Sequence, residues 1–328
     1  MTRDAIAAID IGGTKIALGL SDTEGRSPAF RRFPTRLSDG PHGVMTTALE
    51  ELERMAGEEG ARVLSVGVGC GGPLDRGRGL VLSPPNLPGW DEFPVVRIIE
   101  ERLGVPVALD NDANAAALGE HEYGAGRGLR HLVYMTISTG IGGGLIIGGR
   151  LVHGVGDAAG EVGHTVVEPG GPLCPCGARG CLEALCSGTS IARRAAERIR
   201  AGAGPSLLLK GGGRPEEITA RAVAEAVLQG DALAREVWDE TIEYLARGLV
   251  NVIATLAPEA VILGGGVSTA GELLLGPLRR RVGELVKIMP VERVRIEQAA
   301  LGADSAVYGA LLLARSALQA SQEQAATS

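Results

Sequence analysis

Residues 5–20, AIAAIDIGGTKIALGL, set the fold of this chain. Two apolar runs flank the pair Gly12 and Gly13, and this pattern is typical of two strands joined by a tight turn. Residues 132–147, LVYMTISTGIGGGLII, repeat the order of strand, glycine-rich turn and strand. We interpret the repeat as two related α/β lobes, each of which presents a glycine turn toward a shared cleft. The alternative is that such hairpins arise by chance in a chain with 50 glycines.

The spacing of apolar residues predicts the elements around these hairpins. Further strands are expected at residues 63–68, 105–109 and 260–263, and helices at 44–58, 112–123, 231–256 and 302–320. We expect residues 1–117, completed by the last helix at about 302–320, to form a small α/β lobe. Residues 118–301 are expected to form a larger lobe that carries a metal loop.

Composition limits the class of protein. The chain has 328 residues, 45% of them hydrophobic and 22% charged, which is the balance of an ordered globular protein. The formal charge of −7 argues against nucleic acid or a membrane as a partner, because both attract clustered Lys and Arg. No apolar run reaches the roughly 20 residues of a membrane helix, and residues 1–4 do not begin a secretory signal. We therefore expect a cytoplasmic location.

Three of the five cysteines fall within eight residues, which indicates a metal site and not a disulfide framework. Together with His164, the residues Cys174, Cys176 and Cys181 form the Cys3His set that closes a tetrahedral zinc site. With four protein ligands such an ion has no open position, so we expect a structural role. The alternative is three buried thiols beside a core histidine.

Two glycine turns are candidates for binding phosphate. In the first, unobstructed backbone amides follow a carboxylate that can hold magnesium through water. The candidate nucleotide-binding residues of this turn are Asp10, Gly12, Gly13, Thr14 and Lys15. The second turn, residues 138–144, adds the hydroxyl of Thr139 and the amide of Gly140. After the strand at 260–263, Gly264 and Gly265 can let a base or ribose lie against the backbone.

Each of these turns is only moderately specific, because Asp-x-Gly-Gly sequences also make ordinary turns. The chain has no Walker loop with its Gly-Lys-Ser/Thr ending, and no Gly-x-Gly-x-x-Gly sequence opens a helix. A nucleotide is therefore expected to bind in another way than in P-loop or Rossmann proteins.

Residues 110–114, DNDAN, stand where a strand ends and a helix begins, and four of the five are polar. Helix capping accounts for one Asp or Asn at such a position, but not for four. We interpret Asp112 as the group that accepts a proton from a substrate hydroxyl, and Asn111 as a partner of a neighbouring hydroxyl. Capping alone is the alternative.

Two carboxylates flank the predicted metal loop: Glu161 precedes His164 by three residues, and Glu183 follows Cys181 by two. A rigid loop would hold both as acceptors, which suits a polyhydroxylated substrate because each hydroxyl is a donor. Solvated surface is the alternative for either carboxylate. Asn86, in the sequence SPPNLPGW at 83–90, is a further candidate contact, with an ordinary turn as its alternative.

In this order, the motifs resemble those of the ROK family of sugar kinases and related repressors, and within it the bacterial glucokinases. They are DIGGT (10–14), NDAN (111–114), STGIGGG (138–144), EVGH (161–164), CPCG (174–177) and CLE (181–183). The resemblance covers essentially the whole chain. The resemblance implies an α/β, actin-like ATPase (ribonuclease H-like) fold of two lobes with a central cleft. It also implies a homodimer or homotetramer.

The resemblance implies roles for single residues. Asp112 corresponds to the catalytic base, and the sugar contacts correspond to Asn111, Glu161, His164 and Glu183. His164 would bind zinc through one ring nitrogen and a sugar hydroxyl through the other. The implied nucleotide contacts are Gly12, Thr14, Thr139, Gly140 and Gly265. The chain departs from the family at 67–73, GVGCGGP, where relatives often have Gly-x-Gly-x-Pro-Gly-Pro, so the preferred hexose is left open.

The expected reaction is ATP-dependent phosphorylation of the 6-hydroxyl of a hexose, with magnesium and a structural zinc as cofactors. Glucose is the first candidate, N-acetylmannosamine and fructose are alternatives within the family, and polyphosphate is an alternative donor. A non-enzymatic, sugar-sensing repressor is the remote alternative. It needs a DNA-binding domain before Asp10, where no room is expected, and the chain is acidic.

Overall fold

The computed structural model describes residues 2–202, 206, 208 and 213–327, and within them the chain forms two compact units. The first unit comprises Met1–Gly128, Leu151–Ala159 and Ala303–Ser328, and the second comprises Leu129–Arg150 and Gly160–Gly302. The boundary predicted between residues 117 and 118 falls inside helix α3 (Asp112–Glu122), which lies entirely in the first unit. The reason is that α3 packs along helix α9 (Ser305–Thr327), so both halves of α3 belong to one core.

The first unit is built on a five-stranded sheet with the order β3-β2-β1-β4-β7. β1 and β2 form the predicted antiparallel hairpin, whereas β4 and β7 continue the sheet in parallel with β1. The strands are β1 (Arg3–Ile11), β2 (Lys15–Ser21), β3 (Ala29–Pro34), β4 (Ala61–Cys70) and β7 (Val107–Asn111), and a separate pair is β5 (Leu74–Asp75) with β6 (Leu80–Val81). The other helices of this unit are α1 (Gly40–Glu58) and α2 (Val95–Leu103).

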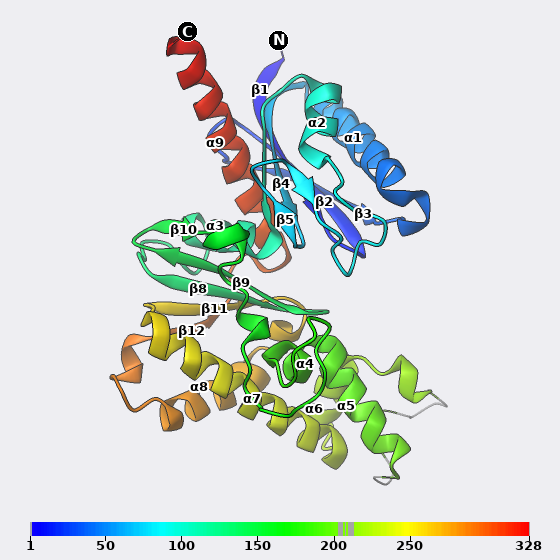
Figure 1. Ribbon diagram of the computed structural model, residues 1–328, viewed down its shortest axis with the longest axis vertical. Helices are drawn as coiled ribbons and strands as arrows, with labels where there is room; N and C mark the ends of the chain where they lie inside the picture. The colour runs from blue at the N-terminus through cyan, green and yellow to red at the C-terminus, as the bar shows by residue number, and fades with distance from the viewer. Residues whose placement is uncertain (1, 203–205, 207, 209–212, 328) are drawn as a thin grey trace. The chain divides into compact units, whose positions relative to one another are not determined.

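Alternate side chains of β1 point to opposite faces of this sheet, and both faces are covered. Ala7 and Ile9 pack with α1 and α2, whereas Ile6 and Ala8 pack with α9. Figure 1 shows α9 on one side of the sheet and α1 and α2 on the other. Because both faces are buried, the strand is a continuous apolar run and not an alternating one.

Glycines allow α9 to lie close to its neighbours. A Cβ on Gly309 would overlap the carbonyl oxygen of Ala115 in α3, and a Cβ on Gly67 of β4 would overlap that of Ala310. The helix also extends beyond its predicted end at residue 320, as far as Thr327. Its last turns are rich in Ala and Gln, which favour helix.

A second five-stranded sheet has the order β10-β9-β8-β11-β12, and apart from Leu151 and Val152 of the edge strand β10 its residues belong to the second unit. β8 and β9 form the second predicted hairpin, and β11 and β12 run parallel to β8. The strands are β8 (Leu132–Ile137), β9 (Ile141–Ile147), β10 (Arg150–Val152), β11 (Ala260–Gly264) and β12 (Arg295–Gln298). The helices are α4 (Leu182–Cys186), α5 (Gly188–Arg200), α6 (Ala220–Leu228), α7 (Ala232–Leu256) and α8 (Glu272–Leu285).

The two sheets share one plan. In each, the strand that opens a glycine hairpin is central, its hairpin partner lies on one side, and two parallel strands lie on the other. Thus β1 corresponds to β8, β2 to β9, β4 to β11 and β7 to β12. The repeat seen in the sequence is confirmed as a repeat of topology, and chance recurrence of hairpins does not explain it.

The core of the second unit lies between its sheet and its helices. Met135 of β8 is buried with Trp238 and Leu245 of α7 and with Leu278 of α8. In Figure 1 the helices of this unit gather on one side of the sheet. None of the helices among the described residues combines the length and the hydropathy that a membrane span requires.

Candidate functional site

The turn between β1 and β2 carries the predicted nucleotide-binding residues of the first unit. The N–H of Gly12 donates to the backbone oxygen of Lys15 over 3.1 Å and closes the turn. A Cβ on Gly13 would lie 2.5 Å from the backbone oxygen of Asn86, so a side chain does not fit there. Thr14 and Lys15 are exposed at the tip. The structure thus places the loop with Asn86 directly against this turn.

Asp10 lies at the end of β1, next to the turn. Burial, and next the negative charge of Asp112, raise the pKa of Asp10 to about 7, against the opposing effect of Lys15 and Arg32. A half-buried carboxylate with a raised pKa gains from a nearby cation, because the cation offsets the cost of desolvation. The position of Asp10 therefore suits the predicted magnesium-binding role.

Three strands of the first sheet end near Asp10. In the register of the sheet, Asp10 pairs with Gly69 of β4, and Gly69 pairs with Asp110 of β7. Parallel strands present their carboxyl ends at the same edge of a sheet, where α/β proteins commonly bind ligands. Asn111 and Asp112 follow Asp110 at this edge, so the first unit brings three predicted site residues together.

Asn111 and Asp112 form the start of helix α3. Asn111 is the N-cap, and its Oδ1 accepts the N–H of Ala113 over 2.8 Å. Oδ1 of Asp112 accepts the same N–H, also over 2.8 Å, and no other residue in the described part of the chain donates to its Oδ2. Capping therefore accounts for Asn111, whereas Oδ2 of Asp112 accepts no hydrogen bond from another residue of the described chain.

Burial raises the pKa of Asp112 above its usual value, and the N–H of Ala113 opposes this shift. A carboxylate with a raised pKa is a better proton acceptor than a solvated one, which suits a general base. Cys70, the last residue of β4, pairs with Asn111 across the sheet. Burial raises the pKa of the Cys70 thiol well above its usual value, so this residue of the divergent 67–73 segment stays protonated.

The carboxylate of Asp110 has partners that the sequence did not indicate. The residue is fully buried, and its Oδ2 lies 2.8 Å from Nε2 of His153 and 3.2 Å from Nε of Arg76. Arg76 follows β5 and His153 follows β10, and 43 residues separate His153 from Asp110. No local motif spans such distances along the chain, so only the fold reveals the cluster.

In the second unit, the turn at 138–144 lies against the start of helix α5. The N–H of Gly188 donates to the backbone oxygen of Ser138 over 2.7 Å, and Oγ1 of Thr189 donates to that of Thr139 over 2.7 Å. The side chain of Thr139 is exposed. Sequence reasoning missed Gly188 and Thr189, because their position beside the turn follows from tertiary structure.

Packing alone explains why positions 264 and 265 are glycines. A Cβ on Gly264 would overlap the hydroxyl of Tyr134. Gly265 has a φ of +81°, and a Cβ there would lie 2.5 Å from the backbone oxygen of Ile137. Because these contacts already require glycine, a nucleotide contact at either residue stays a prediction.

The four predicted metal ligands come together. One ligand atom from each of His164, Cys174, Cys176 and Cys181 lies within 4.8 Å of the others. Nδ1 of His164 is 3.6 Å from Sγ of Cys174, and the Sγ atoms of Cys176 and Cys181 are 3.7 Å apart. Tetrahedral zinc, with bonds of about 2.3 Å to sulfur and 2.0 Å to nitrogen, separates S from S by roughly 3.8 Å and N from S by roughly 3.5 Å. Donor set and spacing both fit this ion.

Tight turns build the ligand loop. The N–H of Gly177 donates to the backbone oxygen of Cys174 over 2.9 Å, and Gly177 and Gly180 have φ of +92° and +77°. Cys174 and Cys181 are buried, whereas Cys176 is exposed. Burial raises the pKa of the Cys174 thiol to about 12. A metal cation is therefore the partner that would hold it as a thiolate.

Glu161 and Glu183 lie near the metal ligands, but in different surroundings. Oε2 of Glu161 is 3.7 Å from Nε2 of His164, and the side chain of Glu161 is 53% exposed. Oε2 of Glu183 accepts the N–H of Ile141 over 2.8 Å. A Cβ on Gly140 would overlap that same oxygen, so Glu183 lies against the second glycine turn.

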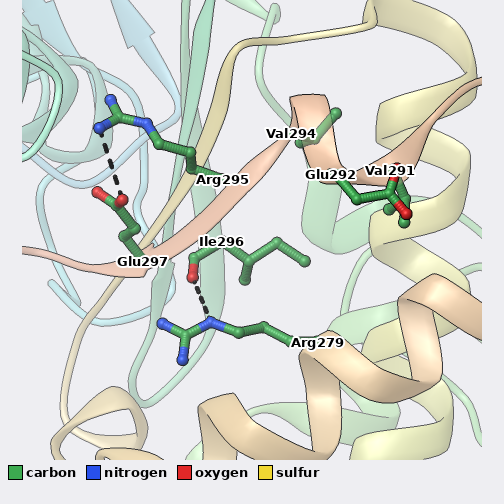
Figure 2. Close-up of a pocket in the computed structure, with 7 residues that line it drawn as sticks. All are labelled: Arg279, Val291, Glu292, Val294, Arg295, Ile296 and Glu297. Atoms are coloured by element: carbon green, nitrogen blue, oxygen red, sulfur yellow. Dashed lines mark hydrogen bonds and ion pairs between the residues drawn. The ribbon is translucent and has the colours of Figure 1, made fainter.

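A cavity of about 400 Å³ lies elsewhere in the second unit (Figure 2), and its lining consists of Arg279, Val291, Glu292, Val294, Arg295, Ile296 and Glu297. Nε of Arg279 donates to the backbone oxygen of Ile296 over 2.8 Å, and Arg295 lies 3.6 Å from Glu297. Arg295 and Glu297 thus form an ion pair within the wall, whereas the ion pair of Arg279 is with Glu272, which does not line the cavity. None of the predicted site residues lines this cavity.

Known proteins resemble the chain over nearly its whole length. Residues 6–317 match the model of the ROK family. The chain is 38% identical over 310 residues to the glucokinase of Thermotoga maritima, covering 94% of this chain and 97% of that protein. It is 36% identical over 263 residues to the N-acetylmannosamine kinase of Escherichia fergusonii, covering 80% of this chain and 83% of that protein.

A solved structure has a fold similar to that of this chain. It is a ROK family glucokinase from Streptomyces griseus in complex with glucose and AMPPNP, with a TM-score of 0.81 and 36% identity, over 95% of this chain and 99% of that one. Two mixed α/β units, each with a five-stranded sheet, identify an actin-like ATPase fold, as predicted. The chain belongs to the ROK family.

Proposed function

We propose that this protein transfers the γ-phosphoryl group of ATP to the 6-hydroxyl of a hexose, with glucose as the preferred substrate. The observation that carries the proposal is the position of Asp112, a half-buried carboxylate at the carboxyl end of β7 with a raised pKa. The Streptomyces griseus relative, whose structure contains glucose and AMPPNP, supports the choice of both substrates.

Asp112 acts as the base in this proposal. Its Oδ1 is engaged by Ala113, so its Oδ2 accepts a hydrogen bond from the 6-hydroxyl and takes the proton as the new phosphate ester forms. Phosphoryl transfer passes through a loose transition state, so the hydroxyl need not be ionised beforehand. Asn111 keeps its Oδ1 for the helix cap and offers its amide N–H groups to a neighbouring sugar hydroxyl.

The two glycine turns bind the triphosphate in the proposal. Backbone N–H groups of the turns hold phosphate oxygens, because no side chain at Gly12, Gly13 or Gly140 blocks their approach. Thr14, Lys15 and Thr139 are exposed and can add donors. Magnesium, held through water near Asp10, would supply positive charge to the phosphates. The base and ribose would lie against Gly264 and Gly265.

The sugar contacts of the second unit are organised by the metal loop. Nδ1 of His164 lies with the cysteine sulfurs, so its Nε2 is left for a sugar hydroxyl beside Glu161. Zinc in the Cys3His set has a structural role, because four protein ligands leave no open position. Glu183 and Asn86 complete the set of candidate acceptors. We further propose a homodimer or homotetramer, which light scattering would establish.

One set of assays tests which hexose is the preferred substrate. Purified protein with ATP and magnesium is offered glucose, mannose, fructose, N-acetylmannosamine and N-acetylglucosamine, and ADP release is coupled to a dye. The proposal predicts the highest kcat/KM with glucose and formation of glucose 6-phosphate. Preference for N-acetylmannosamine would instead match the relative from Escherichia fergusonii. Repeating the glucose assay with polyphosphate in place of ATP tests the alternative donor.

A further inference from the structure

We propose that Arg76 and His153 are positioning residues: they hold the buried carboxylate of Asp110, and through it the Asn111–Asp112 end of β7. This inference rests on the proposed function, because it assigns the two side chains to the geometry of the proposed base. Neither residue belongs to a motif of the sequence, and neither is expected to touch sugar or nucleotide.

Asp110 is the centre of the cluster. Its side chain is 1% exposed, and both of its oxygens are engaged. Oδ1 accepts the N–H of Asn111 over 2.8 Å and Nδ2 of Asn114 over 2.9 Å. Oδ2 faces His153 and Arg76. A buried carboxylate is stable only when charge and hydrogen bonds compensate for lost hydration. The hydrogen bonds from Asn111, Asn114 and His153 and the ion pair with Arg76 therefore hold the group in one orientation.

The two oxygens of Asp110 link distant parts of the unit to the proposed site. Oδ1 accepts hydrogen bonds from the backbone of Asn111, the N-cap of α3, and from the side chain of Asn114 in the first turn of α3. Oδ2 contacts side chains that come from elsewhere in the chain. A carboxylate is planar, so rotation at one oxygen moves the other. Loss of Arg76 or His153 therefore frees Asp110 to turn, and with it the backbone that precedes Asp112.

Arg76 connects three segments. Its Nε lies 3.2 Å from Oδ2 of Asp110 and donates to the backbone oxygen of Leu109 over 3.3 Å. Its Nη1 donates to Oδ1 of Asp157 over 3.2 Å, and its backbone N–H donates to Oδ2 of the same carboxylate over 3.3 Å. The planar guanidinium is suited to such fixed, divergent contacts, which a lysine does not reproduce.

The contacts of Arg76 and Asp110 hold the segment 151–159 in the first unit. His153 and Asp157 both lie in it, and Asp157 has a φ of +59°, an uncommon conformation that the bonds to Arg76 hold in place. Glu161 follows this segment after a single residue, Gly160. The cluster thus fixes the backbone before Asp112 and the stretch of chain that leads to a proposed sugar contact.

The test compares Arg76→Gln and His153→Gln with a matched control, Arg78→Gln. Arg78 lies two residues along the same loop, is 64% exposed and pairs only with Asp75 and Glu92 among the described residues. Steady-state kinetics with glucose and ATP are measured on folded, monodisperse protein, together with thermal unfolding. We expect each cluster variant to lower kcat roughly 10- to 100-fold, because small misplacement of reacting groups has effects of that size.

The pattern of kinetic constants distinguishes a positioning role from one that only stabilises the fold. The KM for sugar should rise several-fold in the cluster variants, while the KM for ATP and the behaviour of Arg78→Gln stay as in the wild type. If Arg76→Gln does not fold, Arg76→Lys serves instead; it keeps the charge beside Asp110 and should retain more activity than His153→Gln. A fall in melting temperature with unchanged kcat in folded protein would overturn the inference.

A double-mutant cycle tests whether the effect passes through Asp110. Arg76→Gln and Asp110→Asn should together lower kcat no more than the more severe of the two alone, because both disrupt one unit. If the fold-losses in kcat of the two single variants multiply in the double variant, the inference is contradicted. An active wild-type enzyme with unaffected variants rejects the inference alone, whereas a wild type that phosphorylates no hexose rejects the proposed function and the inference with it.

Discussion

Asp112→Asn is expected to lower kcat by roughly 10²- to 10⁴-fold, the usual contribution of a general base. The substitution keeps the size of the side chain and an Oδ1 that accepts the N–H of Ala113, as Oδ1 of Asp112 does over 2.8 Å. The cap of α3, supplied by Asn111, is also kept. What the amide lacks is the ability to take a proton. Stopped-time assays of sugar phosphate formation at saturating glucose and ATP give the measurement.

Asp112→Asn also separates catalysis from capping. A residue that only holds the start of α3 would tolerate Asn, because Asn is as good as Asp at helix starts. Glucose affinity, measured by calorimetry without ATP, should change less than about threefold because the amide still forms hydrogen bonds. Asp4→Asn, at an exposed position near the start of β1, is the control and should behave as the wild type. Near-normal turnover by Asp112→Asn would remove this residue from its role.

Cys176→Ser is expected to abolish stoichiometric zinc binding and to raise the KM for glucose about tenfold, because the loop then no longer fixes His164 and its neighbours. Cys176 is exposed, so the change costs little core packing. A loss of a few kcal/mol of metal binding should lower the melting temperature by roughly 2–4 °C per kcal/mol. Metal content by mass spectrometry, thermal unfolding and glucose kinetics are measured on the same sample.

The control for the metal site is Cys186→Ala. Cys186 is buried and lies outside the ligand set, with its Sγ donating to the backbone oxygen of Thr241 over 3.6 Å. This variant should lose stability through packing but keep one zinc ion per chain and a normal KM for glucose. If Cys176→Ser retains both zinc and wild-type kinetics, the loop does not hold its metal through this residue.

The sequence predicted those features that depend on neighbours along the chain. The hairpins around Gly12 and Gly140 follow from apolar runs on either side of glycines, and α7 follows from apolar residues at three- and four-residue steps. The metal cluster was predictable because Cys174, Cys176 and Cys181 are close in sequence and have ligand chemistry. In each case local spacing fixes which side chains meet.

Several elements of the second unit were not predicted, for physical reasons. Helix α8 contains Pro277 in its interior, and Gly276 and Gly283 weaken its helical pattern further. Helix α6 has nine residues, too few for a clear period. The edge strand β12 has four residues, and among the described strands it pairs with β11 alone. Tertiary packing, and not local preference, stabilises such elements.

The cluster around Asp110 marks the limit of sequence reasoning in the candidate site. Nothing about Arg76, His153 or Asp157 distinguishes them from ordinary polar surface residues in the sequence. Their contacts join segments 43 and 81 residues apart, and they exist only because β7, the loop after β5 and the segment 151–159 share one unit. Sequence identified the proposed base at position 112, but not the side chains that hold the backbone before it.

The most direct test of the proposed chemistry is a crystal structure of this protein with glucose and AMPPNP. The distance to measure joins a carboxylate oxygen of Asp112 to the 6-hydroxyl oxygen of the sugar. We predict a hydrogen bond of about 2.6–3.2 Å between them, with the γ-phosphorus facing the same hydroxyl. A sugar bound with its 6-hydroxyl out of reach of Asp112, and Asp112 bonded only to the start of α3, would contradict the proposal.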